Sequence, residues 1–491
     1  MKRDAIQLGI ERERANEPAN VPLVAHSPPS DRPDEWHRLD DHLDGVAELA
    51  RRFASAFRAE AQADLVARLH DLGKATDAFQ AYIRVSWRAR EEGRPPPRRG
   101  SAPHAIHGAL LLWRWLGSAG ASATSVPGFE LAQAVLHHHG RIRNAGDSRA
   151  RLDEAMSDRD LQREAAQAAL GLALGPQTFA GSPPDFAVAD PFEADLLTRF
   201  LVSALVDADR LDTEAFADRQ RAAARTRDRP SLAEMRDVLA SDQAALQEAA
   251  PDTPVNRIRR EMFEAAVKRA GEAPGTFRLT VPTGGGKTRT SLAFALEHAV
   301  RHGMERVVIA IPFTSIIEQT ADVYRGILGS DAVVEHHGNV VDDDAEGHEE
   351  DRWAWRLPTE NWDAPVIVTT TVQLFESLFS NRTSRLRKVH RLARSVIVLD
   401  EAQSLPTSVL APIVNALGTL TRPRFGSSVV LCTATQPALD AVEATGAFSS
   451  VRELAPDPVG TFRSLARVAY DVRIDRPVGV EELAESLRSH A

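Results

Sequence analysis

The stretch from Leu279 to Thr288 constrains the fold more than any other part of the chain. It reads LTVPTGGGKT, an apolar run followed by a Pro–Thr pair, three glycines and a Lys–Thr pair. The apolar run predicts a short buried strand, and apolar residues at helical spacing from Thr290 onward predict a helix. A glycine-rich loop between a strand and a helix offers backbone N–H groups and the positive end of the helix dipole, which together bind phosphate.

The side chains of this loop are those that a nucleotide site requires. A lysine can reach the terminal phosphates, and the threonine hydroxyl after it can hold Mg²⁺. Pro282 stands where the usual pattern has a glycine. A glycine turn without a ligand does not easily explain a Lys–Thr pair here, so we predict a site for ATP and Mg²⁺. The expected nucleotide contacts are Thr283, Gly284, Gly285, Gly286, Lys287, Thr288, Asp400 and Glu401.

Apolar runs alternate with helical patterns after the loop. Four of them read as buried parallel strands and cover residues 307–311, 366–368, 396–399 and 429–432. Polar residues follow each of the four runs, so these polar residues should lie together at the carboxyl edge of one parallel sheet, where ligands bind. Asp400 and Glu401 follow the third run and are typical of a catalytic pair for hydrolysis, in which the Asp holds Mg²⁺ and the Glu polarises water. Thr433 to Thr435 follow the fourth and could couple nucleotide state to movement.

Histidines are concentrated near the N-terminus, where nine of the 16 lie at or before His139. They occur in or beside predicted helices, on the apolar side, where an unpaired polar group is costly, so we expect them to converge on a metal. The candidate groups are His42, His70 with Asp71, His104 and His107, His137 to His139, and Asp207 with Asp209. A His–Asp set suits Mn, Fe, Co, Ni or Zn, and a chain with one cysteine, Cys432, argues against a structural zinc site.

The order of these groups resembles the HD phosphohydrolase superfamily. The resemblance implies two divalent transition metals (Mn, Fe, Co or Ni) bridged by Asp71, with Lys74 neutralising a phosphate oxygen. One metal would be held by His42, His70, Asp71 and Asp209, and the other by Asp71, His104, His138 and His139. Three choices stay open, because His107 competes with His104, the pair His137–His138 with His138–His139, and Asp207 with Asp209.

The phosphate loop and the Asp400–Glu401 pair resemble superfamily 2 helicases of the DExD/H type. A histidine-rich HD domain directly before such a motor is similar to the signature helicase–nuclease of type I CRISPR systems. That resemblance implies a metal-dependent nuclease that degrades single-stranded DNA, coupled to an ATP-dependent helicase, with the guide-RNA surveillance complex Cascade as a partner. It places five residues along the DNA backbone: Thr314, Ser315, Gln319, Thr369 and Thr370.

These patterns together predict a multidomain protein. We expect an all-α HD domain over residues 1–225, a helical linker over 226–255, and an α/β RecA-like helicase lobe with a parallel sheet over 256–460. Residues 461–491, with one strand from Val468 to Val472, resemble only the start of a second RecA-like lobe. We therefore expect nucleotide binding with negligible DNA-stimulated turnover by this chain alone, unless a second chain supplies the missing motor lobe.

Composition narrows the remaining classes. A net charge of −10 gives no global basic field, so DNA binding must rely on local features. Candidates are the basic loops at 91–103 and 140–151 and the segment 381–395 with its six Lys and Arg residues, each of which otherwise reads as solvated surface. No apolar run suits a signal peptide or a membrane span, which predicts a cytoplasmic protein without a membrane partner. The alternative functions are an HD nucleotide phosphohydrolase and a non-enzymatic fragment that docks on Cascade or DNA.

Overall fold

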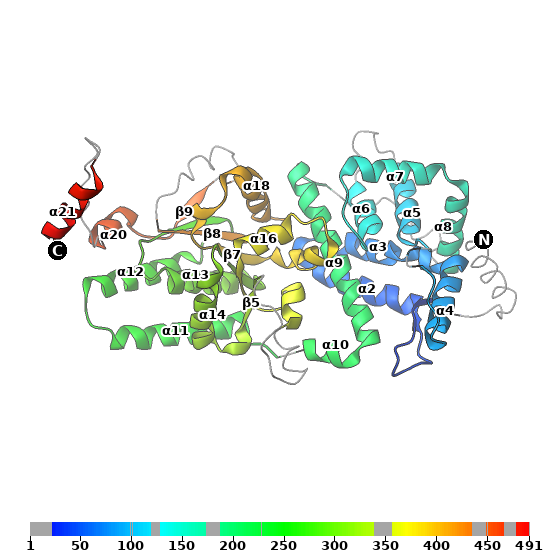
Figure 1. The fold of residues 1–491 in the computed structure, drawn as a ribbon, viewed down its shortest axis with the longest axis horizontal. Coiled ribbons are helices and arrows are strands. Elements are labelled where there is room, and N and C mark those ends of the chain that lie inside the picture. Colours follow the sequence, from blue (N-terminus) through cyan, green and yellow to red (C-terminus); the bar gives the residue numbers. More distant parts are fainter. Residues whose placement is uncertain are drawn as a thin grey trace.

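The computed structural model describes residues 22–98, 100, 102–118, 128–172, 187–226, 228–337, 356–434, 448, 450–465 and 478–490. Figure 1 shows a helical half at the N-terminal end of an elongated molecule and a sheet with its covering helices at the other end. Among the described helices, none combines the length and apolarity that crossing a membrane requires.

The N-terminal half is built from helices packed around α9 (Pro191–Ala217), which contacts α2 (Leu39–Ala54), α3 (Glu60–His70) and α6 (Phe129–His137). The other helices are α4 (Asp77–Glu91), α5 (Ala105–Ser118), α7 (Ala145–Ser157), α8 (Arg159–Gly171) and α10 (Arg219–Arg225). Two short strands, β1 (Val24–His26) and β2 (His37–Arg38), pair in antiparallel fashion beside them. Helix α5 passes α3 at Gly108, where a Cβ atom would lie 1.8 Å from the carbonyl oxygen of Leu69, so only glycine fits.

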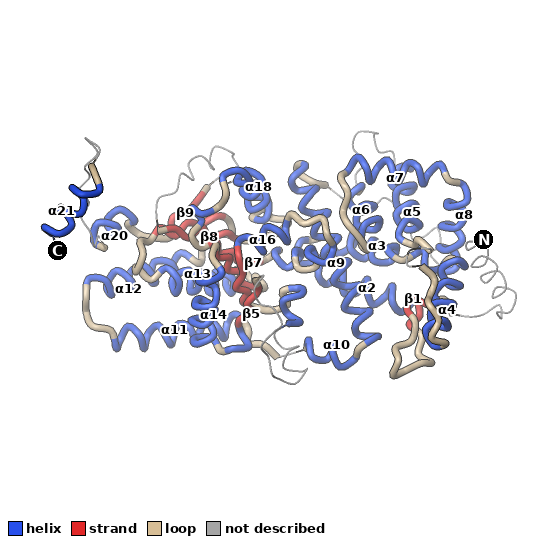
Figure 2. The backbone as a smooth tube through the Cα atoms, in the orientation of Figure 1, coloured by secondary structure: helices blue, strands red, loops and turns tan. Residues whose placement is uncertain are grey.

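The C-terminal half contains a sheet of seven strands in the order β5-β6-β4-β7-β8-β3-β9, with all neighbours parallel. The strands are β3 (Thr276–Thr280), β4 (Arg306–Ile311), β5 (Val333–His336), β6 (Val366–Thr370), β7 (Ser395–Leu399), β8 (Ser428–Thr433) and β9 (Val451–Glu453). Figure 2 shows them in red between helices. The expected helical region followed by an α/β domain with a parallel sheet is thus confirmed. The edge strands β5 and β9 were not predicted.

Several helices complete this half. They are α11 (Leu232–Ala249), α12 (Pro254–Arg269), α13 (Lys287–Arg301), α14 (Thr314–Leu328), α16 (Thr371–Leu378), α17 (Thr383–Leu386), α18 (Leu410–Leu420) and α20 (Pro458–Ser464). Helix α21 (Val480–His490) lies at the C-terminal end of the described residues. Leu232, Met235 and Leu239 of α11 are buried in the same core as β3 and α13, so part of the expected linker belongs to this core. The strand expected from Val468 to Val472 lies outside the described residues.

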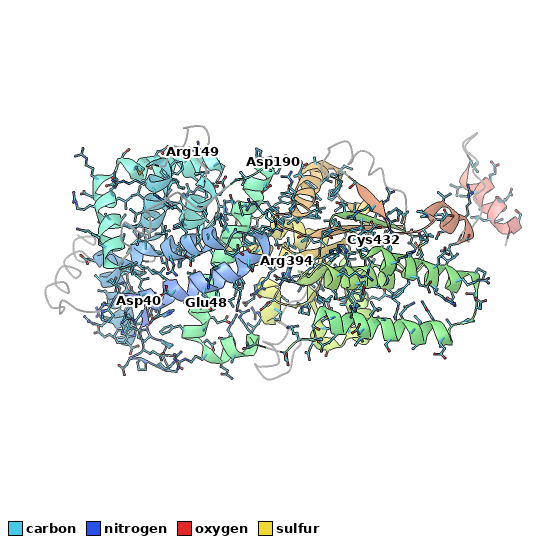
Figure 3. All side chains as sticks on the ribbon, turned by 180° about the vertical axis from the view of Figure 1, so that it is seen from behind. Asp40, Glu48, Arg149, Asp190, Arg394 and Cys432 are labelled. Atoms are coloured by element: carbon cyan, nitrogen blue, oxygen red, sulfur yellow. The ribbon has the colours of Figure 1, made fainter. Side chains whose placement is uncertain are left out.

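The two halves share one apolar core, in which the ring of Phe200 on α9 packs edge-on against Phe425 with centroids 5.0 Å apart. At the start of α9, Asp190 caps the helix and pairs with Arg422 at 2.7 Å. Figure 3 shows Asp190 at the junction of the halves and Cys432 within the sheet. Cys432 is a buried core residue of β8.

The basic segment 381–395 is only partly solvated surface, and its place on a DNA track stays a prediction. It forms the short helix α17 and a 3-10 turn, Val389–Leu392, and Arg387 and Lys388 are only 5% and 6% exposed. Arg387 Nε donates to Asp207 Oδ1 at 2.6 Å, and Asn361 Nδ2 donates to the other oxygen at 3.0 Å. Because a buried carboxylate on α9 needs a cation, this segment turns inward and joins the halves.

Candidate metal centre and nucleotide site

Asp71 lies at the centre of the histidine cluster and is fully buried directly after α3. Its Oδ2 atom lies 3.4 Å from His42 Nε2 and 3.3 Å from His70 Nε2. Asp209 Oδ1 completes this group at 3.6 Å from His42 Nε2 and 3.9 Å from His70 Nε2. The structure therefore brings together the four residues that the resemblance implied for the first metal.

The other carboxylate oxygen of Asp71 serves a second group. Asp71 Oδ1 lies 3.4 Å from His104 Nε2, 3.3 Å from His138 Nε2 and 3.5 Å from His139 Nε2. In each of the two groups, the possible ligand atoms lie within 4.8 Å of one another. One carboxylate that offers a separate oxygen to each group is the arrangement that a bridge between two metals requires.

Five segments deliver these side chains to one point. His42 comes from α2, His70 and Asp71 from the end of α3, His104 from the residue before α5, His138 and His139 from the end of α6, and Asp209 from α9. The turn after Asp71 can approach α5 because Gly73 has no Cβ atom, which would lie 2.4 Å from the carbonyl oxygen of His104. Convergence of separate helices explains why no single sequence motif defines the site.

The chemistry of this cluster fits divalent transition metals. The Nε2 atoms of His42, His70 and His104 are buried and have no hydrogen-bond partner among the described residues. Burial lowers the pKa of His104 to about 4 and that of His138 to about 3, so both imidazoles are neutral at neutral pH, the form that binds a metal. Burial opposes ionisation of Asp71, but the charges of Lys74 and His70 outweigh it and hold the pKa of Asp71 well below its usual range.

The residues that competed with these in the sequence lie elsewhere. His107 Nε2 faces Glu164 Oε2 at 3.3 Å, and His137 Nε2 bonds to the Ser148 hydroxyl at 2.8 Å. Asp207 faces Arg387, on the opposite side of α9 from the cluster. The geometry thus favours His104, the pair His138–His139, and Asp209.

Lys74 is buried beside the cluster, and its Nζ atom lies 2.6 Å from Asp71 Oδ2. The resemblance implied that Lys74 neutralises a phosphate oxygen, and that role stays a prediction; in the structure its charge lies beside the carboxylate of Asp71.

Sequence reasoning missed three neighbours of the cluster: His26, His37 and Asp212. His26, His37 and His42 form a third group with metal-binding distances. We assign no metal to it, because the Nδ1 atom of His42 is already bonded to Asp212 Oδ2 at 2.6 Å. The available signal for Asp212 was its spacing, three residues after Asp209 on one predicted helix.

The phosphate loop connects β3 to α13. Gly284 and Gly286 adopt φ angles of 87° and 91°, a region that side chains rarely occupy. A Cβ atom on Gly285 would lie 2.4 Å from Val281 Cγ1. All three glycines are therefore required by the loop, and Lys287 and Thr288 begin the helix that follows.

Lys287 meets the Asp400–Glu401 pair above the sheet. Its Nζ atom lies 3.3 Å from Asp400 Oδ1 and also bonds to Glu401. Burial disfavours the Lys287 charge, but the two carboxylates outweigh it and raise the pKa of Lys287, while burial raises the pKa of Asp400. Strands β3 and β7 are separated only by β8, so their carboxyl ends bring these residues together as expected.

Only some of the remaining residues expected near nucleotide or DNA have side chains that the structure describes. Thr433 donates to Gln403 Oε1 at 2.9 Å, and Thr435 lies outside the described residues. The side chains of Thr314 and Ser315 are likewise not described, and Gln319 is exposed. The Thr369 hydroxyl donates to the carbonyl of His336, and the Thr370 hydroxyl caps α16. Contact of either residue with DNA stays a prediction.

Two protein families match the chain. The family described as Cas3, HD domain, matches residues 25–206, and DEAD/DEAH box helicase matches residues 257–443. Together these two matches support a Cas3-type HD–helicase. Its CRISPR-associated nuclease/helicase Cas3 relative from Haloferax volcanii is 28% identical over 530 residues, which cover 92% of this chain and 55% of that protein.

Solved structures of Cas3 share the fold. The crystal structure of T. fusca Cas3-ATP has 18% sequence identity and a TM-score of 0.54, and the match covers 88% of this chain and 52% of that one. A chain from a CRISPR RNA-guided surveillance complex in its pre-nicking state has 17% identity and a TM-score of 0.50, with 88% and 49% covered. This Cas3-type chain spans about half the length of the relatives it matches.

Proposed function

We propose that this chain is a metal-dependent nuclease that cleaves single-stranded DNA in CRISPR interference, joined to an ATP-dependent helicase lobe. The observation that carries the proposal is the position of Asp71, whose two oxygens each face a separate group of ligands. Two bound metals would supply hydroxide and steady the attacking and leaving oxygens of a phosphodiester. Asp71 and the surrounding histidines would hold them, and Lys74 would balance the charge of Asp71.

A cavity beside this cluster supports a polymeric substrate. It has a volume of about 760 Å³ and is lined by His104 and His139, by Arg141, Arg143 and Arg151, and by Asn381 from the helicase half. The backbone N–H of Ile142 donates to the Asn381 carbonyl at 2.8 Å, so both halves form the wall. Arginines next to metal ligands suit a phosphodiester backbone, which neutralises them without regard to base sequence.

The basic loop at 140–151 takes part in this wall, although only its first residues form a loop. Asn144 caps α7, and its side chain accepts a hydrogen bond from the Asp147 N–H at 2.7 Å, so Arg151 lies on a helix. The helix fixes part of the basic surface instead of leaving it mobile. A basic surface held partly by a helix beside the cluster favours a role in guiding DNA over a role as solvated surface alone.

ATP with Mg²⁺ is the proposed ligand of the helicase lobe, where Lys287 meets the Asp400–Glu401 pair and Thr288 follows it at the start of α13. A T. fusca relative is described as a complex with ATP. Mn, Fe, Co or Ni are the proposed metals of the HD cluster. The similarity to a chain of a surveillance complex supports Cascade as the proposed partner.

The test uses circular single-stranded DNA with Mn²⁺, Co²⁺ or Ni²⁺ and no ATP. The chain should linearise and degrade the circle, and Asp71→Ala should abolish cleavage. His107→Gln is the matched control, because His107 lies near the cluster in sequence but faces Glu164. Failure to cleave with every metal would refute the nuclease, and hydrolysis of free nucleotides instead would favour the phosphohydrolase alternative.

A further inference from the structure

His42 is held through both nitrogens of its ring. Its Nε2 atom faces Asp71 and Asp209, at 3.4 and 3.6 Å. Its Nδ1 atom lies 2.6 Å from Asp212 Oδ2. An ionised carboxylate only accepts hydrogen bonds, so Asp212 keeps a proton on Nδ1, and Nε2 is the nitrogen that faces the cluster and would bind a metal in exchange for its own proton.

We propose that Asp212 is a positioning residue of the metal centre, which orients His42 and fixes the tautomer that presents Nε2 to the metal. The inference rests on the proposed dinuclear centre and extends it beyond the groups that would touch a metal. Asp212 and Asp209 are three residues apart on α9 and so share one face of the helix. One rigid helix therefore supplies a candidate ligand and the group that orients its neighbour.

Helix α2 makes room for this carboxylate. Gly45 follows His42 by three residues and faces the same way, and a Cβ atom there would lie only 2.2 Å from Asp212 Oδ1. Gly45 lies in the middle of α2, where glycine is less favourable than alanine because it loses more backbone entropy on folding. The close approach of Asp212 gives a physical reason for that glycine.

Asp212 also sets His42 apart from the other buried histidines. The Nδ1 atoms of His70 and His138 donate to the backbone carbonyls of Ala67 and Val135, at 2.6 and 2.7 Å. A carboxylate raises the basicity of an imidazole more than a carbonyl does, since it carries a full charge. His42 should therefore bind a metal more strongly than His70 or His138, and its contribution to metal affinity should depend on Asp212.

The surroundings hold Asp212 in place from a second side. His37 Nε2 lies 3.6 Å from Asp212 Oδ2, and the ring of His37 stacks on Phe216 with centroids 4.3 Å apart. Phe216 lies on α9, one turn beyond Asp212. The carboxylate thus sits between α2, β2 and its own helix, not on open surface.

The experiment titrates Mn²⁺ into the full, metal-free chain by calorimetry. Asp212→Ala should weaken binding at one of two sites by about 10- to 100-fold, the usual effect of losing such a partner. Asp212→Asn should recover most of the affinity, because its carbonyl oxygen still accepts from Nδ1. Gly45→Ala should reproduce the loss although Asp212 is intact, since the added methyl group displaces the carboxylate.

A proton spectrum gives a readout that a loss of packing would not produce. The Nδ1 proton of His42 should give a low-field resonance that is present in the native chain and in Asp212→Asn but absent from Asp212→Ala. Asp195→Ala is the matched control, because Asp195 is exposed on the same helix and pairs with Arg199, away from the cluster. Undiminished affinity in both Asp212→Ala and Gly45→Ala would overturn the role of Asp212. Failure of the native chain to bind metal would instead overturn the proposed centre, and this role with it.

Discussion

Replacing Arg387 by methionine tests how the two halves are joined. Asp207 is fully buried on α9, and Arg387 and Asn361 donate to its two oxygens at 2.6 and 3.0 Å. The substitution keeps most of the side-chain volume but leaves a buried carboxylate with one neutral donor. Removing one partner of a buried pair costs about 3–5 kcal/mol. Arg387 also contacts Glu360 at 2.8 Å, but Glu360 keeps Arg225 as a partner and adds little to the loss.

The double variant Arg387→Met/Asp207→Leu should regain most of that stability, because an apolar pair of similar volume often replaces a buried ion pair without loss. Urea unfolding followed by tryptophan fluorescence measures both, since Trp362 is buried in the helicase lobe. Arg385→Met is the control in the same segment. Arg385 is half exposed, as is its partner Glu376, and its loss should cost less than about 1 kcal/mol.

The pH dependence gives the prediction a sign. Burial raises the pKa of Asp207 above its usual value, although Arg387 opposes the shift. A folded-state pKa above the unfolded one stabilises the fold at low pH, and that contribution is lost as pH rises through the folded value. Without Arg387 the pKa of Asp207 rises further. Arg387→Met should therefore lose more stability at about pH 8 than at about pH 5. A cost below about 1 kcal/mol, with no recovery in the double variant, would refute the reasoning.

Two further predictions concern ligands. Lys287→Ala should weaken binding of a fluorescent ATP analogue by about 10- to 100-fold, the value of a hydrogen bond to a charged group, and unchanged affinity would contradict the assigned phosphate loop. Arg143→Glu should weaken binding of single-stranded DNA and make it less dependent on salt, since one phosphate contact is lost. Arg163→Glu, an exposed residue of α8 outside the cavity, should leave that binding unaltered.

The sequence was sufficient where a residue type and its local context fix the chemistry. The glycines, Lys287 and Asp400 sit at strand ends, and parallel strands bring such ends to one edge, so their meeting was predictable. The choice between His104 and His107 was not, because both open the same helical segment. Only the start of α5 at Ala105 leaves His104 free to turn toward Asp71, while His107 faces Glu164.

Other features depend on partners that lie far away in the chain. Arg387 and Asp207 are 180 residues apart, so the segment around Arg387 looks like a polar helix until its partner is known. Strand β9 spans only Val451–Glu453, with one apolar side chain, and is defined by pairing to β3 and not by hydrophobicity. In the sequence, Asp212 looks like an ordinary residue on a helix surface. Its proposed role depends on the space that Gly45 leaves in α2, which only the packing of the two helices reveals.

The position of helix α9 limits which amino-acid substitutions the chain can accept during evolution. One of its faces is completed by the helicase half through Phe200 and Asp207, and another carries Asp209 and Asp212 toward the histidines. A change in Asp207 is tolerable only with a matching change in Arg387, because either partner alone leaves an uncompensated buried group. The two halves therefore inherit a shared constraint. Homologous chains should exchange nuclease and helicase halves only when the residues facing α9 are exchanged with them.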